Sequence, residues 1–233
     1  MKKVLIIIPA YNEEESIERT ITSVRDFLND ADLAFQLDYL VINDGSRDRT
    51  AELTRHMNAD MIDFYTNLGL SGGFMAGMKY ANRHDYDCAI QFDADGQHLP
   101  EYIPAMVEAA ESGVDIVIGS RFVTEKHRNS LREAGNVLIS VAIKVMTGKT
   151  VKDPTSGMRL FSRRAIDYYV KNSNMTPEPE TISYFIKKGF DVKEVQVKMQ
   201  ERVAGESYLT IRRSIQYMAR VIISILILQP FRR

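Results

Sequence analysis

The sequence predicts an α/β protein with a mostly parallel sheet, and three observations support this prediction. Short apolar segments alternate with segments of helical periodicity over the first 120 residues, as in repeated strand–helix–strand units. Polar clusters follow four of the apolar segments, at 9–13, 43–46, 93–97 and 119–121. The 30 Lys and Arg residues balance the 31 Asp and Glu residues in a chain of 233, so nucleic acid is not an expected partner.

The first apolar run, KVLIIIPAY, is nearly continuous and reaches Pro9, which is typical of a buried parallel strand. It is too short for a signal peptide, and the single Cys88 lies in an apolar stretch, so a buried thiol and a reducing, cytoplasmic setting are expected. In 12–28, apolar residues recur on one helical face. The next elements are predicted as strand 37–46, helix 47–57, strand 60–67, helix 71–84, strand 87–93, helix 99–111 and strand 114–120.

The pattern changes after residue 121. An amphipathic helix is predicted over 128–148, a short strand over 157–161 and a helix over 177–189. Residues 191–199 alternate with a period of two, as a half-exposed strand does. The last segment, 208–233, is helical in period and strongly apolar. We divide the chain into one α/β domain, residues 1–210, and a C-terminal amphipathic helix, residues 211–233.

The four polar clusters predict a binding site, because ligands of parallel sheets bind beyond the carboxyl ends of the strands. Common phosphate-binding motifs do not fit this chain. The glycines of GLSGGFMAG do not form G-x-G-x-x-G, and no Lys-Ser or Lys-Thr pair follows them as a P-loop requires. DADGQH is not a calcium loop, since His98 stands where that loop needs glycine.

The segment QFDADGQHLPE places Asp93 and Asp95 two residues apart after an apolar run. In an extended segment such residues point to the same side, about 7 Å apart. Two adjacent carboxylates stay ionised more easily when a cation lies beside them. A small set of hard oxygen ligands suits Mg²⁺ or Mn²⁺, and Gln97 could add a neutral oxygen. On this stretch alone, an Asx-rich turn remains the alternative.

Six segments in order, IIPAYNEEESI, VINDGSRDRT, NLGLSGGFMAGMKYA, QFDADGQHLPE, IVIGSRF and DPTSGMRLF, resemble the pattern of glycosyltransferase family 2. The resemblance covers roughly residues 3–210. It implies the GT-A fold, a Rossmann-like nucleotide-sugar-binding fold. The branch that it resembles most is that of polyprenol-phosphate glycosyltransferases similar to dolichol-phosphate mannose synthase.

The resemblance implies a role for each matching position. Catalytic roles are expected for Asp93, Asp95, Asp153 and Arg159, with Asp93, Asp95 and Gln97 at the metal. The donor is expected to contact Pro9, Tyr11, Glu13, Asp44, Gly69, Asp93 and Arg121. The acceptor phosphate is expected to contact Arg121, Arg128, Arg132, Ser156 and Arg159. Arg132 stands where the branch often has Ser, and Tyr208 follows GES where the branch often reads G-x-S-K.

The expected activity is an inverting, metal-dependent transfer of a sugar from a nucleotide-sugar to polyprenyl phosphate. A phosphate monoester has a second pKa near ~6 and needs cations to hold it rather than a general base, and arginine binds phosphate as a planar fork. His98 is therefore interpreted as a supporting or surface residue. The alternative is transfer to a hydroxyl of a lipid-linked or free saccharide in cell-envelope polysaccharide synthesis, which needs a base. A UDP-sugar is favoured over a GDP-sugar, with both kept open.

The C-terminal segment predicts contact with a membrane. Residues 221–228 are far shorter than the roughly 20 apolar residues that span a bilayer. From residue 200 onward, six Arg stand against two Glu, which suits the surface of an anionic leaflet. We expect a peripheral protein on the inner face of the cell membrane, held by the bilayer surface or a small membrane protein. A subunit contact in a homo-oligomer is the alternative.

Overall fold

The structure, a computed structural model, describes residues 1–125, 131–172, 175–200 and 211–229, the side chains of 131, 132 and 211–215 excepted. Its central strand is β1 (Lys3–Ala10), which pairs in parallel with β2 (Gln36–Asn43) and with β4 (Cys88–Gln91). Residues Val4 to Ile8 of β1 are at most 1% exposed, because helices cover both faces of this strand. The predicted buried strand at the start of the chain is confirmed.

The sheet has seven strands in the order β3-β2-β1-β4-β6-β5-β7. The remaining strands are β3 (Met61–Asp63), β5 (Ile116–Ser120), β6 (Arg159–Ser162) and β7 (Val192–Gln196). Strand β6 runs antiparallel to both of its neighbours, whereas the other strand pairs are parallel. The predicted mostly parallel α/β sheet is thus confirmed.

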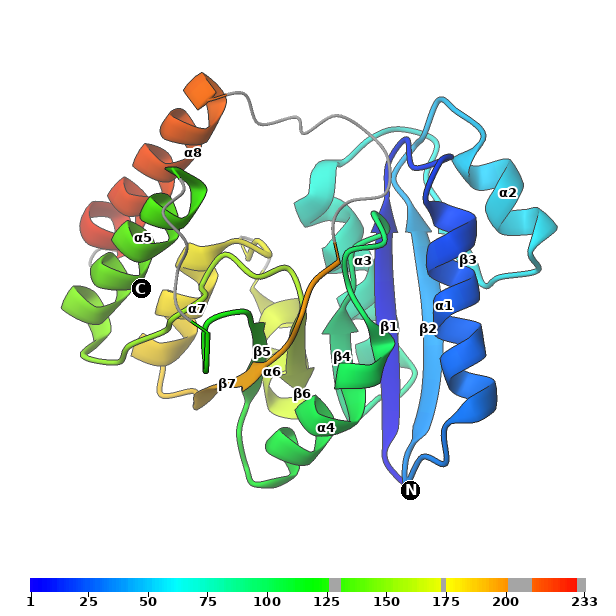
Figure 1. The fold of residues 1–233 in the computed structure, drawn as a ribbon, viewed down its shortest axis with the longest axis horizontal. Coiled ribbons are helices and arrows are strands. Elements are labelled where there is room, and N and C mark those ends of the chain that lie inside the picture. The colour runs from blue at the N-terminus through cyan, green and yellow to red at the C-terminus, as the bar shows by residue number, and fades with distance from the viewer. Residues whose placement is uncertain (126–130, 173–174, 201–210, 230–233) are drawn as a thin grey trace.

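Two layers of helices sandwich the sheet (Figure 1). One layer contains α1 (Ile17–Asp30), α2 (Thr50–His56), the 3₁₀ turn η1 (Pro100–Tyr102) and α4 (Ile103–Glu111). The other contains α3 (Gly69–Arg83), α5 (Leu131–Thr147), α6 (Arg163–Lys171), α7 (Pro179–Lys187), α8 (Ile211–Ile223) and the π-helical turn η2 (Ser224–Leu228). Side chains of β1 alternate between the layers: Val4, Ile6 and Ile8 join the first core, and Leu5 and Ile7 the second.

The glycines of α3 serve packing, at least at Gly77. A Cβ added there would lie 2.4 Å from Cγ2 of Ile7 in β1, so glycine lets the helix approach the central strand closely. This accounts for one glycine of a segment that matches no phosphate-binding motif.

Two elements differ from the sequence predictions. Helix α6 was not predicted, although Ser162 caps it by accepting a hydrogen bond from the Ala165 amide and Ile166 and Tyr169 are buried at helical spacing. Strand β3 has three residues instead of the predicted eight, because it pairs only with the last residues of β2 at the sheet edge.

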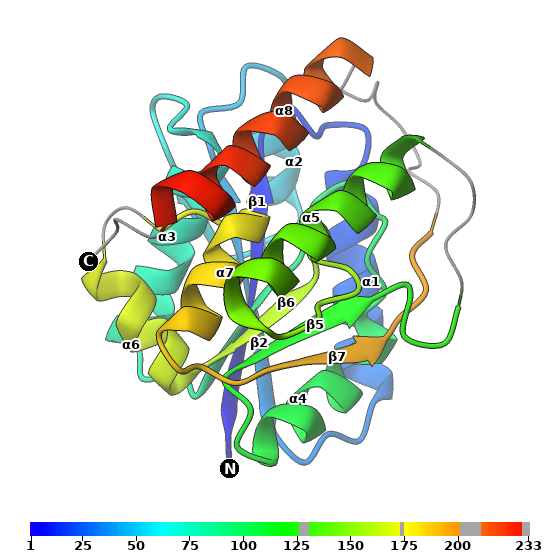
Figure 2. The ribbon, with the colours of Figure 1, turned by 90° about the vertical axis from the view of Figure 1, so that its left-hand side faces the viewer.

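Helices α5 and α8 lie side by side at one end of the molecule, over α7 (Figure 2). At this contact, a Cβ on Gly135 would overlap the side chain of Met218, so the two helices approach closely there. Val221 and Ile225 are fully buried in the same core. Within the described ranges, no helix combines the length and apolar character needed to cross a bilayer.

Candidate active site

The four polar clusters lie at one edge of the sheet. Strands β1, β2, β4 and β5 all point the same way, so the segments 9–13, 43–46, 93–97 and 119–121 follow or form their carboxyl ends. A fifth segment, 153–157, reaches the same edge because β6 is antiparallel. The first residue of β6, Arg159, pairs with Gln91, the last residue of β4. The expected site edge is therefore formed, with an added loop.

The loops after β1 and β2 are bonded to each other. The amide of Asn12 donates to Ser46 Oγ (3.0 Å), and its Oδ1 accepts from the Arg47 amide (2.9 Å). The Glu13 amide donates to Thr50 Oγ1 (2.8 Å), and Glu13 Oε2 accepts from Ser16 Oγ (2.6 Å). These bonds fix the position of Glu13 at the rim of the site.

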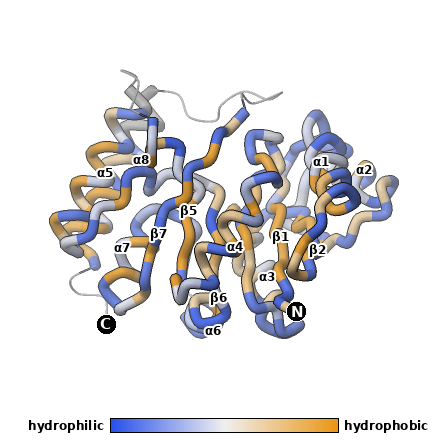
Figure 3. Tube along the Cα trace, turned by 60° about the horizontal axis from the view of Figure 1, so that its bottom comes forward, coloured by the Kyte–Doolittle hydropathy of each residue, from blue (hydrophilic) through white to orange (hydrophobic). Residues whose placement is uncertain are grey.

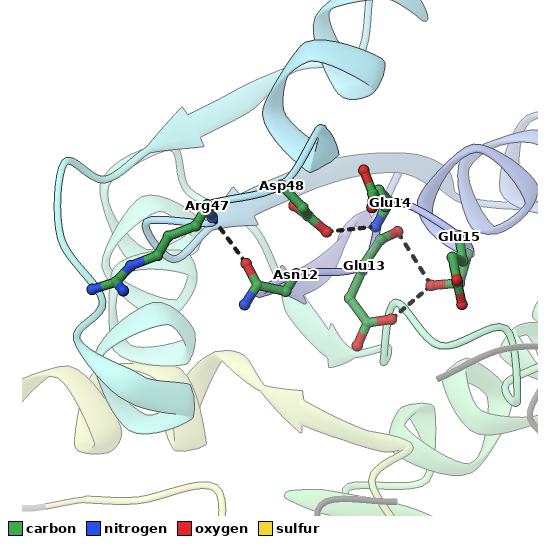
Figure 4. Close-up of a pocket in the computed structure, with 7 residues that line it drawn as sticks. Asn12, Glu13, Glu14, Glu15, Arg47 and Asp48 are labelled. Carbon is green, nitrogen blue, oxygen red and sulfur yellow. Dashed lines mark hydrogen bonds between the residues drawn. The ribbon is translucent and has the colours of Figure 1, made fainter. Parts of the chain in front are cut away.

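A pocket of about 380 Å³ opens between these two loops (Figure 4). Its lining has four carboxylates against one guanidinium, so it repels a diphosphate. Without a cation, this pocket therefore disfavours the phosphates of a nucleotide. The lining residues are Asn12, Glu13, Glu14, Glu15, Ser16, Arg47 and Asp48.

Asp44 follows β2 and is 3% exposed. Its Oδ1 accepts from the Leu68 amide (2.7 Å) at the start of α3, and its carbonyl accepts from Asn67 Nδ2 (3.1 Å). Asp44 thus holds the entry to α3 in place. Gly69 lies directly after this entry with φ 76°, and the space where a Cβ would stand is open. Pro9 and Tyr11 are half-buried at the end of β1.

Asp93 lies just before a turn and Asp95 within it, which corrects the expectation of an extended segment for both. Strand β4 ends at Gln91, and Ala94 and Asp95 belong to the turn that follows. Gly96 has φ 76°, a conformation that glycine adopts without strain. Asp95 is 5% exposed, and its Oδ1 accepts from the Gln97 amide (3.1 Å). The Asx-type turn and the carboxylate pair therefore coexist.

Asp93 is the more open member of the pair, with a side chain 37% exposed. The buried His98 supports it: Nδ1 accepts from the Asp93 amide (2.9 Å), and Nε2 lies 3.7 Å from Asp93 Oδ2. Gly157 closes over this carboxylate, since a Cβ there would lie 2.3 Å from Asp93 Oδ2. His98 therefore positions the turn, in agreement with its interpretation as a supporting residue.

The donor set of this turn fits a divalent cation that shares its ligands with a substrate. Among the described residues, no three His, Cys, Asp or Glu side chains gather as a closed metal site. Two carboxylates with few other protein ligands are typical of Mg²⁺ bound to substrate phosphates. The side-chain Nε2 of Gln97 donates to the Gln200 carbonyl (3.3 Å), so any metal contact from this side chain would come from its Oε1.

Asp153 is completely buried and paired with Arg121. Its Oδ2 accepts from Arg121 Nε, and its Oδ1 from Arg121 Nη2, both at 2.8 Å. The Asp153 amide donates to Glu194 Oε1 (2.8 Å). This hydrogen-bonded pair raises the pKa of the Arg121 guanidinium. The Arg121 side chain stays 32% exposed, so it can still meet an anionic substrate, whereas Asp153 orients it from below.

Arg159 lies away from solvent, in contrast to the expected contact with a phosphate. It is 2% exposed, and its three nitrogens Nε, Nη1 and Nη2 donate to the carbonyls of Ser156 (2.8 Å), Pro177 (3.0 Å) and Pro154 (2.8 Å). Burial lowers the pKa of its guanidinium. Arg159 therefore shapes the 153–157 loop, and its position in β6 explains why it points inward.

Ser156 is also buried, at 1% exposed, and its Oγ donates to the Gly119 carbonyl (2.6 Å). It ties the loop to the end of β5. Arg128 and the Arg132 side chain lie outside the described residues. Of the arginines expected at the acceptor phosphate, the described part of the chain therefore presents Arg121 at the surface and Arg159 in the core.

Comparison with known proteins identifies the family. Residues 5–170 match the profile described as glycosyl transferase family 2, which is most of the chain. The chain belongs to glycosyl transferase family 2. The family resemblance predicted from the six motifs is thus confirmed, and so is the prediction that the chain is a glycosyltransferase.

Two relatives of this chain act on lipid phosphates according to their names. An undecaprenyl-phosphate mannosyltransferase of Micrococcus luteus is 30% identical over 89% of this chain and 88% of its own length. A polyprenol monophosphomannose synthase of Mycolicibacterium smegmatis is 26% identical over 90% of this chain and 82% of its own length.

Solved structures with a similar fold support the GT-A architecture. Glucosyl-3-phosphoglycerate synthase of Mycobacterium tuberculosis, in complex with Mn²⁺, UDP-glucose and phosphoglyceric acid, has a TM-score of 0.66 at 17% identity, covering 98% of this chain and 79% of its own. A mannosyltransferase of Pyrobaculum calidifontis, in complex with GDP-Man and Mn²⁺, has a TM-score of 0.65 at 19% identity, covering 94% and 62%. The predicted GT-A fold is confirmed.

Sequence reasoning missed two residues of the candidate site. Gly157 lets the 153–157 loop cover Asp93, and Glu194 in β7 receives the amides of both Lys152 and Asp153 (2.8 Å each). Glu194 reads in the sequence as an exposed position of an alternating strand. No local signal could have assigned it to the site, because the contact is made across the sheet edge.

Proposed function

We propose that this family 2 enzyme transfers a sugar from a nucleotide-sugar donor to a polyprenyl phosphate. The observation that carries the proposal is the 30% identity to an undecaprenyl-phosphate mannosyltransferase over nearly all of both chains. The site supports it independently, since a carboxylate pair for a donor diphosphate and a partly exposed arginine, Arg121, share one sheet edge. Both UDP- and GDP-sugars remain candidate donors, because the two solved neighbours hold one of each.

The proposed reaction is a single displacement with inversion at the anomeric carbon. A phosphate oxygen of the acceptor forms the new bond to that carbon as the bond to the nucleoside diphosphate breaks. The acceptor phosphate is already largely ionised at neutral pH, with a second pKa near ~6, so no side chain has to remove a proton. Arg121, oriented by Asp153, would hold a phosphate by charge-assisted hydrogen bonds.

Asp93 and Asp95 would hold the divalent cation, with Gln97 assisting from its amide oxygen. When bound there, Mg²⁺ or Mn²⁺ supplies positive charge against the departing diphosphate. His98 and Gly157 keep Asp93 in place for this role, and the backbone N–H of Gln97 does the same for Asp95. Pro9, Tyr11, Glu13, Asp44 and Gly69 would border the nucleotide at the ends of β1, β2 and the start of α3.

We further propose that the enzyme acts peripherally on the inner face of the cell membrane, where nucleotide-sugars and the phosphate group of a polyprenyl lipid meet. The mass of the detergent-extracted complex would show whether a small membrane protein or further copies of this chain are bound.

The product decides between the proposed acceptor and a hydroxyl acceptor. Incubation with radiolabelled nucleotide-sugar and undecaprenyl phosphate is expected to give a labelled lipid. Mild acid should release the labelled sugar from this lipid, because a sugar phosphate ester at the anomeric carbon is acid-labile. Asp93→Ala serves as the inactive control. Label that appears only in an acid-stable glycoside would contradict the proposal and favour saccharide transfer.

One observation favours the hydroxyl alternative. Glu180, in the first turn of α7, is partly buried, and burial raises the pKa of its carboxyl. Its Oε2 is buried without a hydrogen-bond partner among the described residues, and the carboxyl lies within electrostatic reach of Arg159; a carboxyl with a raised pKa suits a general base. Such a base works as the carboxylate, so activity would fall on the acid side, starting at a higher pH than for an ordinary glutamate.

With a phosphate acceptor, Glu180→Gln is expected to keep kcat/KM within about threefold and to leave the acid side of the pH profile in place. If Glu180 is a base, kcat falls by about 10²–10⁴ and the acid limb that it causes disappears. Rates measured between pH 4.5 and 8 for both proteins test this. A melting curve of each protein at each pH serves as the folding control.

A further inference from the structure

Helix α8 has an apolar contact with α5 and a polar contact with α7. The contact with α5 is made by Met218, whose side chain lies against Gly135. Helix α5 is largely hydrophobic (Figure 3) and, in contrast to the predicted amphipathic helix, is apolar on its outer face as well, where three valines are 40–72% exposed: Val137, Val141 and Val145. The contact with α7 differs in kind, because hydrogen bonds lead from it to the candidate active site.

The polar contact centres on the carboxylate of Glu178, the N-cap residue of α7. The hydroxyl of Tyr217 in α8 donates a hydrogen bond to Glu178 Oε2, and Arg220 Nη2 lies 3.6 Å from Glu178 Oε1. The Arg220 side chain is 66% exposed, so its ion pair is weak. Tyr217 is half-buried and the Glu178 side chain is only 22% exposed, so the hydroxyl of Tyr217 is the firmer hold on this carboxylate.

Arg159 contacts the entry to α7 next to Glu178. Its Nη1 donates to the carbonyl of Pro177 (3.0 Å), and the other two carbonyls that it contacts are neutral as well. The charge of this buried guanidinium therefore has to be balanced by carboxylates farther away. Glu178, Asp93 and Glu180 lie within electrostatic reach. Burial raises the pKa of the Glu180 carboxyl and so favours its neutral form, which leaves Glu178 and Asp93 to balance the charge.

Arg159 also holds the loop that covers Asp93. Its Nε and Nη2 donate to the carbonyls of Ser156 and Pro154, both at 2.8 Å. Gly157 is the next residue of this loop, and a Cβ on it would lie 2.3 Å from Asp93 Oδ2. A continuous series of contacts therefore joins α8 to the carboxylate pair.

We propose that Tyr217 and Glu178 are positioning residues that keep Asp93 available to the divalent cation. Tyr217 holds the Glu178 carboxylate where it balances part of the charge of Arg159. Without this balance, Arg159 would interact more strongly with Asp93, and a cation would compete with the guanidinium for that carboxylate. The inference rests on the proposed function only for the role of Asp93 and Asp95 at the cation.

The test is the affinity of the full chain for Mn²⁺. Mn²⁺ is titrated into the protein with saturating UDP, and separately with GDP, while the electron paramagnetic resonance signal of free Mn²⁺ is recorded. Glu178→Gln keeps the size of the side chain and an oxygen for Tyr217 but removes the charge, and we expect its Kd for Mn²⁺ to rise about tenfold or more. Tyr217→Phe removes only the hydroxyl, so its Kd should rise by a smaller factor.

Tyr184→Phe and Glu111→Gln are the matched controls. Tyr184 also lies in α7, and its hydroxyl accepts from the hydroxyl of Tyr168 (3.3 Å). Glu111 is 54% exposed and paired with Lys2 (3.2 Å). Both variants should bind Mn²⁺ as the wild type does, and melting curves of all four variants check that they are folded.

The rate of sugar transfer gives a second readout that a purely structural role would not produce. If Glu178 acts through the cation, excess Mn²⁺ should restore the rate of Glu178→Gln to nearly that of the wild type. A variant that only loosens the fold would keep a lowered kcat at every Mn²⁺ concentration, and this result would contradict the inference.

Unchanged Mn²⁺ affinity in folded Glu178→Gln would overturn the inference, and so would an equal loss in Tyr184→Phe and Tyr217→Phe. It also fails if the wild type binds Mn²⁺ no better than Asp95→Asn does. If Glu178→Gln loses affinity as expected but the wild type transfers no sugar to polyprenyl phosphate, the inference stands and the proposed acceptor is wrong. If the wild type transfers sugar to polyprenyl phosphate and Glu178→Gln keeps its Mn²⁺ affinity, the acceptor stands and the inference is wrong.

Discussion

Asp95→Asn is expected to lower kcat for sugar transfer by about 10³-fold or more, since it removes a charge that holds the cation against the departing diphosphate. Asparagine keeps an oxygen that can accept from the Gln97 amide, as Asp95 Oδ1 does at 3.1 Å. The turn should therefore survive, and the melting temperature should change little. Transfer of radiolabelled sugar across a Mn²⁺ titration is the measurement, and the variant should not regain wild-type rate at any Mn²⁺ concentration.

Asp191→Asn is the matched control, because Asp191 is an exposed carboxylate whose ion pair with Lys149 lies at the surface. A surface pair of this kind contributes little to stability, so rate and metal dependence should stay those of the wild type. Full turnover by Asp95→Asn, or by the wild type in excess chelator, would contradict the proposed role of the carboxylate pair.

The site edge could be predicted from the sequence because strand direction and polarity are local signals. A run of buried residues that ends in Asp93 or in Asn43 places those side chains at a carboxyl end, whatever the rest of the chain does. Parallel pairing then brings the ends together. The same reasoning predicted the sheet and most of its helices, since apolar periodicity reports burial.

Contacts that cross the fold could not be predicted in this way. The reversal of β6 follows from its pairing between β4 and β5, and this reversal brings the loop with Asp153 to the site. It also turns Arg159 inward. The sequence marks this loop as a candidate functional segment. Only the three-dimensional pairing shows that Arg121 reaches solvent whereas Arg159 is buried and holds the loop.

The exposure of α5 was hidden for a similar reason. Its residues Val137, Val141 and Val145 recur every four positions, as core residues would, and the sequence does not reveal which of two apolar faces meets the sheet. In the structure α8 packs on α5 through Gly135 and Met218, and the valines stay outside. A helix with two apolar faces is therefore informative about partners only when its packing is known.

Arg159→Ala is expected to lower the free energy of unfolding by about 3 kcal/mol or more, because three buried carbonyls lose their donor and each unmet group costs about 1–3 kcal/mol. For a chain of this size the melting temperature would fall by about 6–12 °C. The control is Arg49→Ala: this side chain is 65% exposed and paired with the equally exposed Glu52, and its loss should leave the stability almost unchanged. Thermal unfolding of both variants gives the comparison.

Arg159→Lys separates the two roles that the sequence and the structure assign to this residue. A lysine has one ammonium group on a flexible stem and cannot reproduce the fixed fork that reaches Ser156, Pro177 and Pro154. If Arg159 shapes the loop, the lysine variant should be destabilised nearly as much as the alanine variant, and kcat should fall while KM for the lipid phosphate changes little. If Arg159 bound the acceptor phosphate, lysine would preserve stability and much of the rate, and its effect would appear in KM for the acceptor. The buried guanidinium, with a carbonyl at each of its three nitrogens, favours the first result.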